Sequence, residues 1–357
     1  MGVKWGERAR LLMRSVWFSV GRDSLSDQAG ALTYYMILSA FPLLLAVVSL
    51  LSLLGVADTL VPALEQLLDS VVSQEVAQFL AGLVRGFLTG TGATWTLLLA
   101  VLVAIWSASK YVAAFGRAMN TVFGVVEGRP FLKLKAMQLL LTASMIVAIV
   151  MALAAMILSD PVTQWLDETL HIGSTLTKTW LALRTPLAIS LVSAVLAALY
   201  YITPNVRRRR RALLSVGAVV AILAVIVVFW GFGLYLNVFD GTSNYTKTYG
   251  ALAGGVLALF SMWLINFVAL IGAEVDAQLE RLRELANGLP AERQLLLPVR
   301  DDRGQIRREQ RQESLAEAAA ELRQRYLADG AKPDAWYQRY CCEALAESAP
   351  DADISET

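Results

Sequence analysis

Residues 31–55 read ALTYYMILSAFPLLLAVVSLLSLLG and contain no charged side chain. A transmembrane helix needs about 20 consecutive, mostly apolar residues, so this stretch is long enough to cross a bilayer. The composition of the whole 357-residue chain agrees, because 56% of its residues are hydrophobic, only 17% are charged and its mean hydropathy is +0.53. Charged residues make up about 25% of ordinary soluble domains. The sequence therefore predicts an integral membrane protein.

Five further stretches have the same apolar character, and together with the first they predict an all-α, polytopic fold with six transmembrane helices. The six predicted spans are residues 31–55, 95–115, 138–158, 186–203, 212–236 and 250–273. The strands of a transmembrane barrel would instead alternate in polarity over about ten residues, unlike these uninterrupted Leu, Val and Ala runs. We predict an N-terminal segment over residues 1–30, a membrane domain over 31–276 and a charged cytoplasmic tail over 277–357.

Lysine and arginine residues gather in alternate connections between the predicted spans. They are numerous before the first span, after the second and after the fourth, whereas the connections after the first, third and fifth hold one or two each. Basic residues accumulate on the cytoplasmic side of membrane proteins. The alternation therefore predicts that both termini lie in the cytoplasm.

Segments outside the spans show helical patterns as well. The first 21 residues mix basic and apolar residues without an uncharged core, which argues against a signal peptide and predicts an amphipathic helix on the membrane surface; a solvated basic leader is the alternative. Residues 58–94 predict one or two amphipathic periplasmic helices, either simply packed or forming a re-entrant gate. Beyond residue 290 we expect a partly disordered tail with one amphipathic helix over residues 305–328.

The sequence offers few groups for catalysis. It has one histidine, and its two cysteines, Cys341 and Cys342, are adjacent and are expected to be free thiols in the cytoplasm. Asp167, Glu168 and His171 lack a further firm metal ligand and more simply form a solvated loop. We therefore expect no enzymatic activity, no catalytic or metal-binding residue and no cofactor. The net charge of +1 gives no reason to expect a nucleic-acid partner.

A sparse set of polar or conformationally special residues lies in or beside the spans. Polar groups in hydrocarbon need partners, so we expect them to face one another inside the bundle. Alternatives are an interfacial belt for the tyrosines, a helix kink at the proline and close helix packing at the glycine. The candidate transport or structural residues are Tyr34, Tyr35, Pro42, Lys110, Asn120, Tyr249, Gly250 and Glu274.

Two of these candidates, Lys110 and Glu274, are charged at neutral pH when exposed to water. Lys110 is a transport candidate, or it extends to the interface from near the cytoplasmic end of its helix. Gly272 and Ala273 allow another helix to approach closely, so we predict that Glu274 faces the bundle rather than lying at the interface. Its expected partner is Lys110, Arg117 or Asn120, whereas Asp276 is expected to be solvated.

A run of five arginines follows the fourth span. It is explained as a topology signal, and it is also a candidate site for anionic lipid headgroups. The residues are Arg207, Arg208, Arg209, Arg210 and Arg211.

Three stretches together resemble the YihY/BrkB family of bacterial inner-membrane proteins. They are DSLSDQAGALTYYMILSAFPLLLAVVSLL from Asp23, the stretch from Ser107 to Phe123 that contains RAMNTVF, and YGALAGGVLALFSMWLINFVALIGAEVDAQL from Tyr249. The resemblance covers residues 5–285. It implies six transmembrane helices and no established enzymatic activity, although the family was once labelled ribonuclease BN.

The resemblance also implies a role in envelope integrity. We accordingly expect the protein to handle or translocate a lipid-like or anionic amphiphile, with membrane lipids, including lipopolysaccharide-type molecules, as partners. A cation/proton exchanger and a non-catalytic membrane scaffold are the alternatives, and a homo-oligomer remains open. The residues give no support to a tRNA nuclease.

Overall fold

The structure is a computed structural model that describes residues 5–53, 93–157, 174–207, 215–238, 253–332 and 334–336. Regular structure within these ranges consists of eight helices and one isolated bridge between Val206 and Val299. The predicted all-α class is therefore confirmed. The chain divides into two compact units, Met1–Asp302 and Arg303–Thr357.

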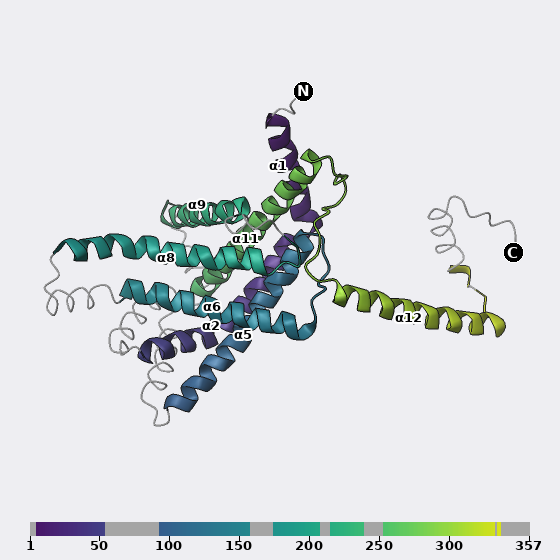
Figure 1. Ribbon diagram of the computed structural model, residues 1–357, viewed down its shortest axis with the longest axis horizontal. Coiled ribbons are helices and arrows are strands. Elements are labelled where there is room, and N and C mark those ends of the chain that lie inside the picture. The colour runs from purple at the N-terminus through teal and green to yellow at the C-terminus, as the bar shows by residue number, and fades with distance from the viewer. Residues whose placement is uncertain are drawn as a thin grey trace. The chain divides into compact units, whose positions relative to one another are not determined.

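The first unit contains all the predicted membrane spans that the structure describes. Its helices are α1 (Trp5–Arg22), α2 (Leu25–Leu53), α5 (Ala93–Val122), α6 (Phe131–Ile157), α8 (Ser174–Ile202), α9 (Val216–Val238) and α11 (Ala253–Ala286) (Figure 1). Each predicted span overlaps one of α2, α5, α6, α8, α9 and α11. By length and composition, Phe131–Ala152, Ala182–Ile202 and Gly255–Ala286 can cross a membrane, and Val216–Val228 is a shorter apolar helix.

Helix α8 begins earlier than the sequence predicted. The fourth span was expected to start at Pro186, but the helix starts at Ser174 and includes the proline. Lys178 and Arg184 made the preceding stretch resemble a loop. Basic residues are compatible with a helix near a membrane surface, because a long side chain can carry its charge out to the interface.

Helix α2 contains Pro42, which has no N–H to donate. The carbonyl oxygen of Leu38, four residues earlier, therefore loses its helical donor. The hydroxyl of Ser107 on α5 donates to this oxygen at 3.4 Å. The backbone defect in α2 thus becomes a contact with the neighbouring helix.

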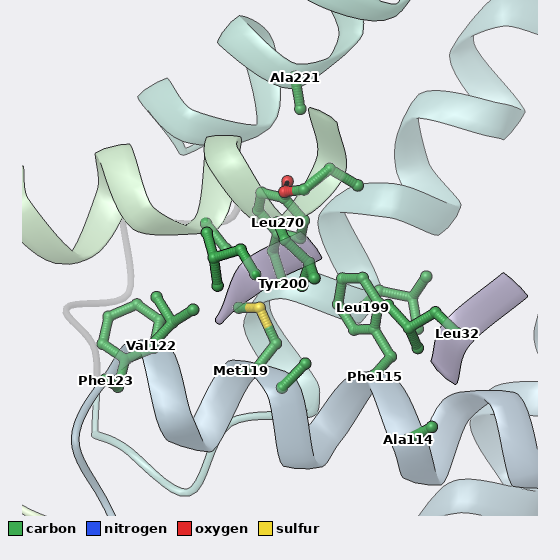
Figure 2. Packing of buried hydrophobic residues seen from close by; sticks show 14 of the residues in the cluster. Leu32, Ala114, Phe115, Met119, Val122, Phe123, Leu199, Tyr200, Ala221 and Leu270 are labelled. Carbon is green, nitrogen blue, oxygen red and sulfur yellow. Dashed lines mark hydrogen bonds between the residues drawn. The ribbon is translucent and has the colours of Figure 1, made fainter. Parts of the chain in front are cut away.

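The core lies where the helices pack in pairs: α2 against α5, α6 against α8 and α9 against α11. Figure 2 shows Phe115 and Met119 pointing from α5 toward Leu199, Tyr200 and Leu270. The rings of Phe115 and Tyr200 stack with centroids 6.0 Å apart. The Tyr200 hydroxyl also donates a hydrogen bond to the carbonyl oxygen of Ala269. Apolar packing and one buried hydrogen bond therefore join α5, α8 and α11.

Helices α9 and α11 meet through two glycines. A Cβ atom placed on Gly217 would lie 2.0 Å from the carbonyl oxygen of Gly272, and one on Gly272 would lie 2.5 Å from that of Gly217. The two backbones are therefore in direct contact. The close approach predicted at Gly272 is thereby confirmed, whereas Gly250, the other position predicted to allow close packing, lies outside the described part of the chain.

Helix α11 runs unbroken across position 276 and ends at Ala286, followed by Gly288 in the left-handed region with φ 77°. Residues 291–302, which were expected to belong to a partly disordered tail, are instead part of the first unit: Ala291 is buried, and Leu295 and Leu297 contact the core. In the second unit, α12 (Arg303–Ala328) confirms the amphipathic helix expected at 305–328, and its residues are not buried.

Candidate functional site

A cavity of about 680 Å³ lies among the membrane helices of the first unit. Helices α2, α5, α6, α8, α9 and α11 all contribute to its wall, chiefly with aliphatic side chains such as Leu43, Val112, Ile146, Val192 and Ile226. Its volume falls within the roughly 300–1,000 Å³ that is typical of small-molecule sites. Apolar cavities of this kind accept apolar ligands rather than water.

Two of the hydroxyl groups on the cavity wall are already satisfied by their own helices. Ser39 donates to the carbonyl oxygen of Tyr35 at 2.7 Å, and Thr142 donates to that of Gln138 at 2.7 Å. These groups therefore add little polarity to the cavity. Its surface is suited to hydrocarbon.

The cavity extends to the outer surface of the bundle at α8 and α9. Ile189 and Val192 of α8 and Ile226 of α9 line it, yet they are 57%, 58% and 58% exposed. The cavity is thus open at the outer surface of the helix bundle, and the side chains at its opening are apolar.

Polar side chains join three helices at one wall of the cavity. The hydroxyl of Tyr111 on α5 lines the cavity and donates to Oδ1 of Asn266 on α11 at 2.9 Å. Nδ2 of Asn266 donates to the Thr33 hydroxyl on α2 at 3.2 Å and to the Met262 carbonyl at 2.9 Å. Because Asn266 is fully buried, this chain of hydrogen bonds fixes how the three helices cross.

A second polar cluster joins the connections at one end of the bundle; we call it the helix-end network. It consists of Asn120, Glu127, Arg129, Asn205 and Asp301. Asn120 donates to Glu127 at 3.0 Å and accepts from the backbone N–H of Asn205 at 2.8 Å. Asn205 in turn donates to the carbonyl oxygens of Val126 at 3.1 Å and Asp301 at 2.8 Å. The network therefore ties the α5–α6 and α8–α9 connections to the segment after α11.

Arg129 and Glu127 form the ionic centre of this network. The guanidinium makes two hydrogen bonds to the carboxylate, at 2.7 and 2.6 Å, and also donates to the backbone carbonyls of Ile202 and Thr203. Burial alone would raise the pKa of Glu127, but the hydrogen bonds and charge of Arg129, helped by Asn120, lower it below its ordinary value. Glu127 is therefore held as a carboxylate.

Gly128, between these two charged residues, allows the chain after α11 to come close. A Cβ atom at this position would lie 1.9 Å from the carbonyl oxygen of Asp301. The sequence predicted a role for Asn120 but not for Glu127, Arg129 or Asp301. Arg129 is one of the basic residues after the second predicted span, which were interpreted only as a topology signal. A useful signal was a Glu-Gly-Arg triplet in a short loop between two apolar helices.

Glu274 is fully buried on α11, as predicted, but its partners differ from those expected. Its Oε1 accepts a hydrogen bond from Gln278 at 2.8 Å, and the same amide nitrogen lies 3.1 Å from the Ser19 hydroxyl on α1. Its Oε2 has no hydrogen-bond partner among the described residues. The predicted pairing with Lys110, Arg117 or Asn120 is wrong. The hydrogen bond that the Glu274 carboxylate accepts comes from Gln278, and Asn120 belongs to the helix-end network. Glu274 instead lies where α1 packs on α11.

Asp276 was expected to be solvated, and this prediction is also wrong. The residue is only 9% exposed, and its Oδ1 accepts a hydrogen bond from the backbone N–H of Gly217 at 2.7 Å. The first N–H groups of a helix have no partner within the helix. Asp276 satisfies one of these groups at the start of α9, which explains why a carboxylate is placed there.

The remaining candidates do not meet at one site. Lys110 and Tyr34 are exposed, and Tyr35 is half-buried with the Arg117 guanidinium 6.0 Å from its ring centre. Arg207 is exposed, and its backbone N–H donates to the carbonyl oxygen of Pro298 at 2.8 Å. Outside the described residues lie Tyr249, Gly250, Arg208, Arg209, Arg210 and Arg211.

Long apolar helices with buried polar contacts and an apolar cavity open at the outer surface of the bundle define a helical membrane protein. The profile of the family described as Virulence factor BrkB matches residues 16–294, so the chain belongs to this family. The resemblance to the YihY/BrkB family inferred from three stretches of sequence is thereby confirmed.

The chain is similar to several bacterial proteins, most of which are named as membrane proteins. The chain is 31% identical over 275 residues to a UPF0761 membrane protein of Tolumonas auensis, covering 76% of this chain and 86% of the relative. It is 27% identical over 265 residues to one of Aeromonas salmonicida, covering 73% and 86%. It is also 26% identical over 273 residues to a protein of Bacillus subtilis named ribonuclease-like protein YfkH, covering 74% and 93%. No solved structure matches the chain.

Proposed function

We propose that this protein spans the bacterial inner membrane six times, with both termini in the cytoplasm, and handles a lipid-like amphiphile without catalysing a chemical reaction. The observation that carries this proposal is the apolar cavity of about 680 Å³ that reaches the outer surface of the bundle at α8 and α9. A hydrocarbon chain can enter such a cavity sideways from the bilayer. It then exchanges one apolar environment for another and does not have to cross water.

The meeting of four segments at one end of the bundle supports the proposed topology. The helix-end network joins the connection after α5, the connection after α8 and the segment after α11, while Gln278 near the end of α11 contacts Ser19 of α1. The proposed topology has an even number of spans between these segments and so requires all of them on one side of the membrane, which their contacts support. Their basic residues favour the cytoplasmic side.

Thiol labelling is expected to show this orientation. In a background without Cys341 and Cys342, single cysteines at Ser70 and Ser174 should react with an impermeant reagent added outside spheroplasts. A cysteine at Ser314 should react only after permeabilisation. The topology would be contradicted if, from outside the spheroplasts, the cysteine at position 174 did not react and the cysteine at position 314 did.

Filling the cavity is expected to slow lipid handling. Ala188 of α8 lines the cavity, so Ala188→Trp places an indole ring in the space that an acyl chain would occupy. In liposomes, we expect the rate of protein-dependent translocation of fluorescent phosphatidylglycerol to fall about tenfold or more, which corresponds to a rise of at least ~1.4 kcal/mol in the activation free energy. Ala182→Trp is the matched control, because this exposed alanine of α8 does not line the cavity. Equal rates for the two variants would contradict a role for the cavity.

The buried Glu274 gives the rival cation/proton exchanger its best support, because an ionisable group inside a membrane domain is often functional. The same liposomes should therefore be assayed for cation–proton flux. Flux abolished by Glu274→Gln, without lipid movement in the parent protein, would favour the exchanger. If neither lipid movement nor cation–proton flux is detected, the non-catalytic scaffold is favoured. The ribonuclease-like name belongs to the Bacillus relative, and our proposal includes no nucleic-acid partner.

A further inference from the structure

We infer that Lys110, Lys135 and Trp106 form a site for the phosphate group of an anionic membrane lipid, on the outer face of α5 and α6. This site is separate from the apolar cavity, and the inference does not depend on lipid handling there. It rests on the depth of these three residues, on their mutual geometry and on the absence of an acidic partner among the described residues.

The exposed face of α5 locates the membrane boundary. Along this face the exposed side chains are first apolar and then polar, in the order Leu99, Leu102, Val103, Trp106, Lys110, Arg117, Thr121. The change occurs between Trp106 and Lys110. Tryptophan and lysine are typical of the headgroup region of a bilayer. A cation at this position therefore meets lipid phosphates rather than hydrocarbon or bulk water.

Lys135 of α6 is fixed beside this boundary by two contacts with α5. Its Nζ donates to the Ser109 hydroxyl at 2.8 Å and lies 4.4 Å from the centre of the Trp106 ring. An ammonium group has three N–H donors. The serine uses one and the ring interacts with the charge, so donor capacity remains for a ligand.

Lys110 directly follows Ser109, to which Lys135 donates, and so places a second positive charge near that of Lys135. Among the described residues, neither lysine has an ion pair with a carboxylate. Lys133 differs, because its Nζ lies 3.0 Å from the Asp301 carboxylate. Two neighbouring cations with no acidic partner repel each other, and an anion between them turns that repulsion into attraction on both sides.

A lipid phosphate satisfies this pair better than a soluble phosphate. Toward the membrane centre the site continues into exposed aliphatic side chains on the same face of α5, Leu102 and Val103. Acyl chains attached to the phosphate can lie along this surface. Basic sites between transmembrane helices on the cytoplasmic side bind anionic lipid headgroups in the same way.

The test is a lipid titration of the purified full-length protein by native mass spectrometry, with phosphatidylglycerol and phosphatidylcholine as probes. We expect Lys110→Met/Lys135→Met to weaken phosphatidylglycerol binding about tenfold or more, since each interfacial cation contributes about fivefold. Phosphatidylcholine binding should not change. Arg307→Met/Arg308→Met is the control, because it removes the same charge from two exposed residues of α12.

Two further variants keep the result interpretable. Lys110→Arg/Lys135→Arg keeps both charges and should retain phosphatidylglycerol binding. Lys110→Met alters an exposed side chain and should fold normally while losing about fivefold. Millimolar inorganic phosphate should not compete with the lipid. Equal losses in the site and control double variants, or complete competition by inorganic phosphate, would overturn the assignment.

Discussion

Arg129→Met is expected to lower the free energy of unfolding by about 3–5 kcal/mol, as is typical when one partner of a buried ion pair is removed. The Arg129 side chain is only 4% exposed, and its guanidinium binds the Glu127 carboxylate and two backbone carbonyls. Without it, Glu127 keeps its charge in a partly buried site and the carbonyls of Ile202 and Thr203 lose a donor. Denaturant unfolding in detergent, followed by circular dichroism, measures the change.

Arg283→Met supplies the control, because Arg283 pairs with Glu280 on the surface of α11 and is 63% exposed. Exposed ion pairs contribute about 0–1 kcal/mol. Glu127→Gln/Arg129→Met should regain part of the stability lost in the single arginine variant, since no buried charge is left unpaired. Equal destabilisation by the two arginine substitutions would show that the helix-end network does not contribute as described.

The pH dependence of stability gives a second readout of the same pair. Because Arg129 lowers the pKa of Glu127 in the folded protein, the stabilisation is complete above the ordinary carboxyl pKa of about 4.3 and is lost as the pH falls through the lower folded pKa. The parent protein should therefore exceed Glu127→Gln in stability at neutral pH. The difference should shrink as the pH falls below about 4.

Gly272→Val is expected to disrupt the packing of α9 on α11. Even a Cβ atom at this position would lie 2.5 Å from the carbonyl oxygen of Gly217 and 2.7 Å from the Cβ of Ala221. Overpacking costs about 1–3 kcal/mol when side chains can adjust, and more is expected here because one obstacle is backbone. The free energy of unfolding in detergent measures the loss.

Gly255→Ala is the matched control in the same helix, because nothing lies within 4 Å of a Cβ atom placed there. Alanine is favoured over glycine in a helix by roughly 0.5–1 kcal/mol, so this variant should be as stable as the parent or slightly more so. If Gly272→Val matched the stability of Gly255→Ala, the direct contact between the two backbones would be refuted.

Apolar segment length predicts where the helices of this fold lie. The uncharged run over residues 31–55 must satisfy its backbone hydrogen bonds internally if it enters a bilayer, which only a helix allows in a single segment. The described part of that run lies in α2, and the other predicted spans also fall on helices. Helix ends were less predictable: Lys178 and Arg184 resembled loop residues, although α8 contains both.

Partner choice among the polar residues was not predictable from membrane depth alone. Lys110 and Glu274 were expected at similar depth, but depth does not determine which sides of two helices face each other. The amide of Gln278, which holds Glu274, also contacts Ser19, a residue 259 positions away in the sequence. That contact depends on how α1 crosses α11, and the apolar pattern of neither helix encodes the crossing.

The helix-end network also constrains the order in which the protein can be completed during synthesis. Asn205 follows α8, but one of its hydrogen bonds goes to the carbonyl oxygen of Asp301, 96 residues later. Gly128, after α5, packs against the same residue. Since a chain emerges from the ribosome N-terminus first, the junction between α5, α6 and α8 must wait for α9, α11 and the segment that follows. A nascent chain ending at Ala286 would hold every described membrane helix yet lack the residue that closes this junction.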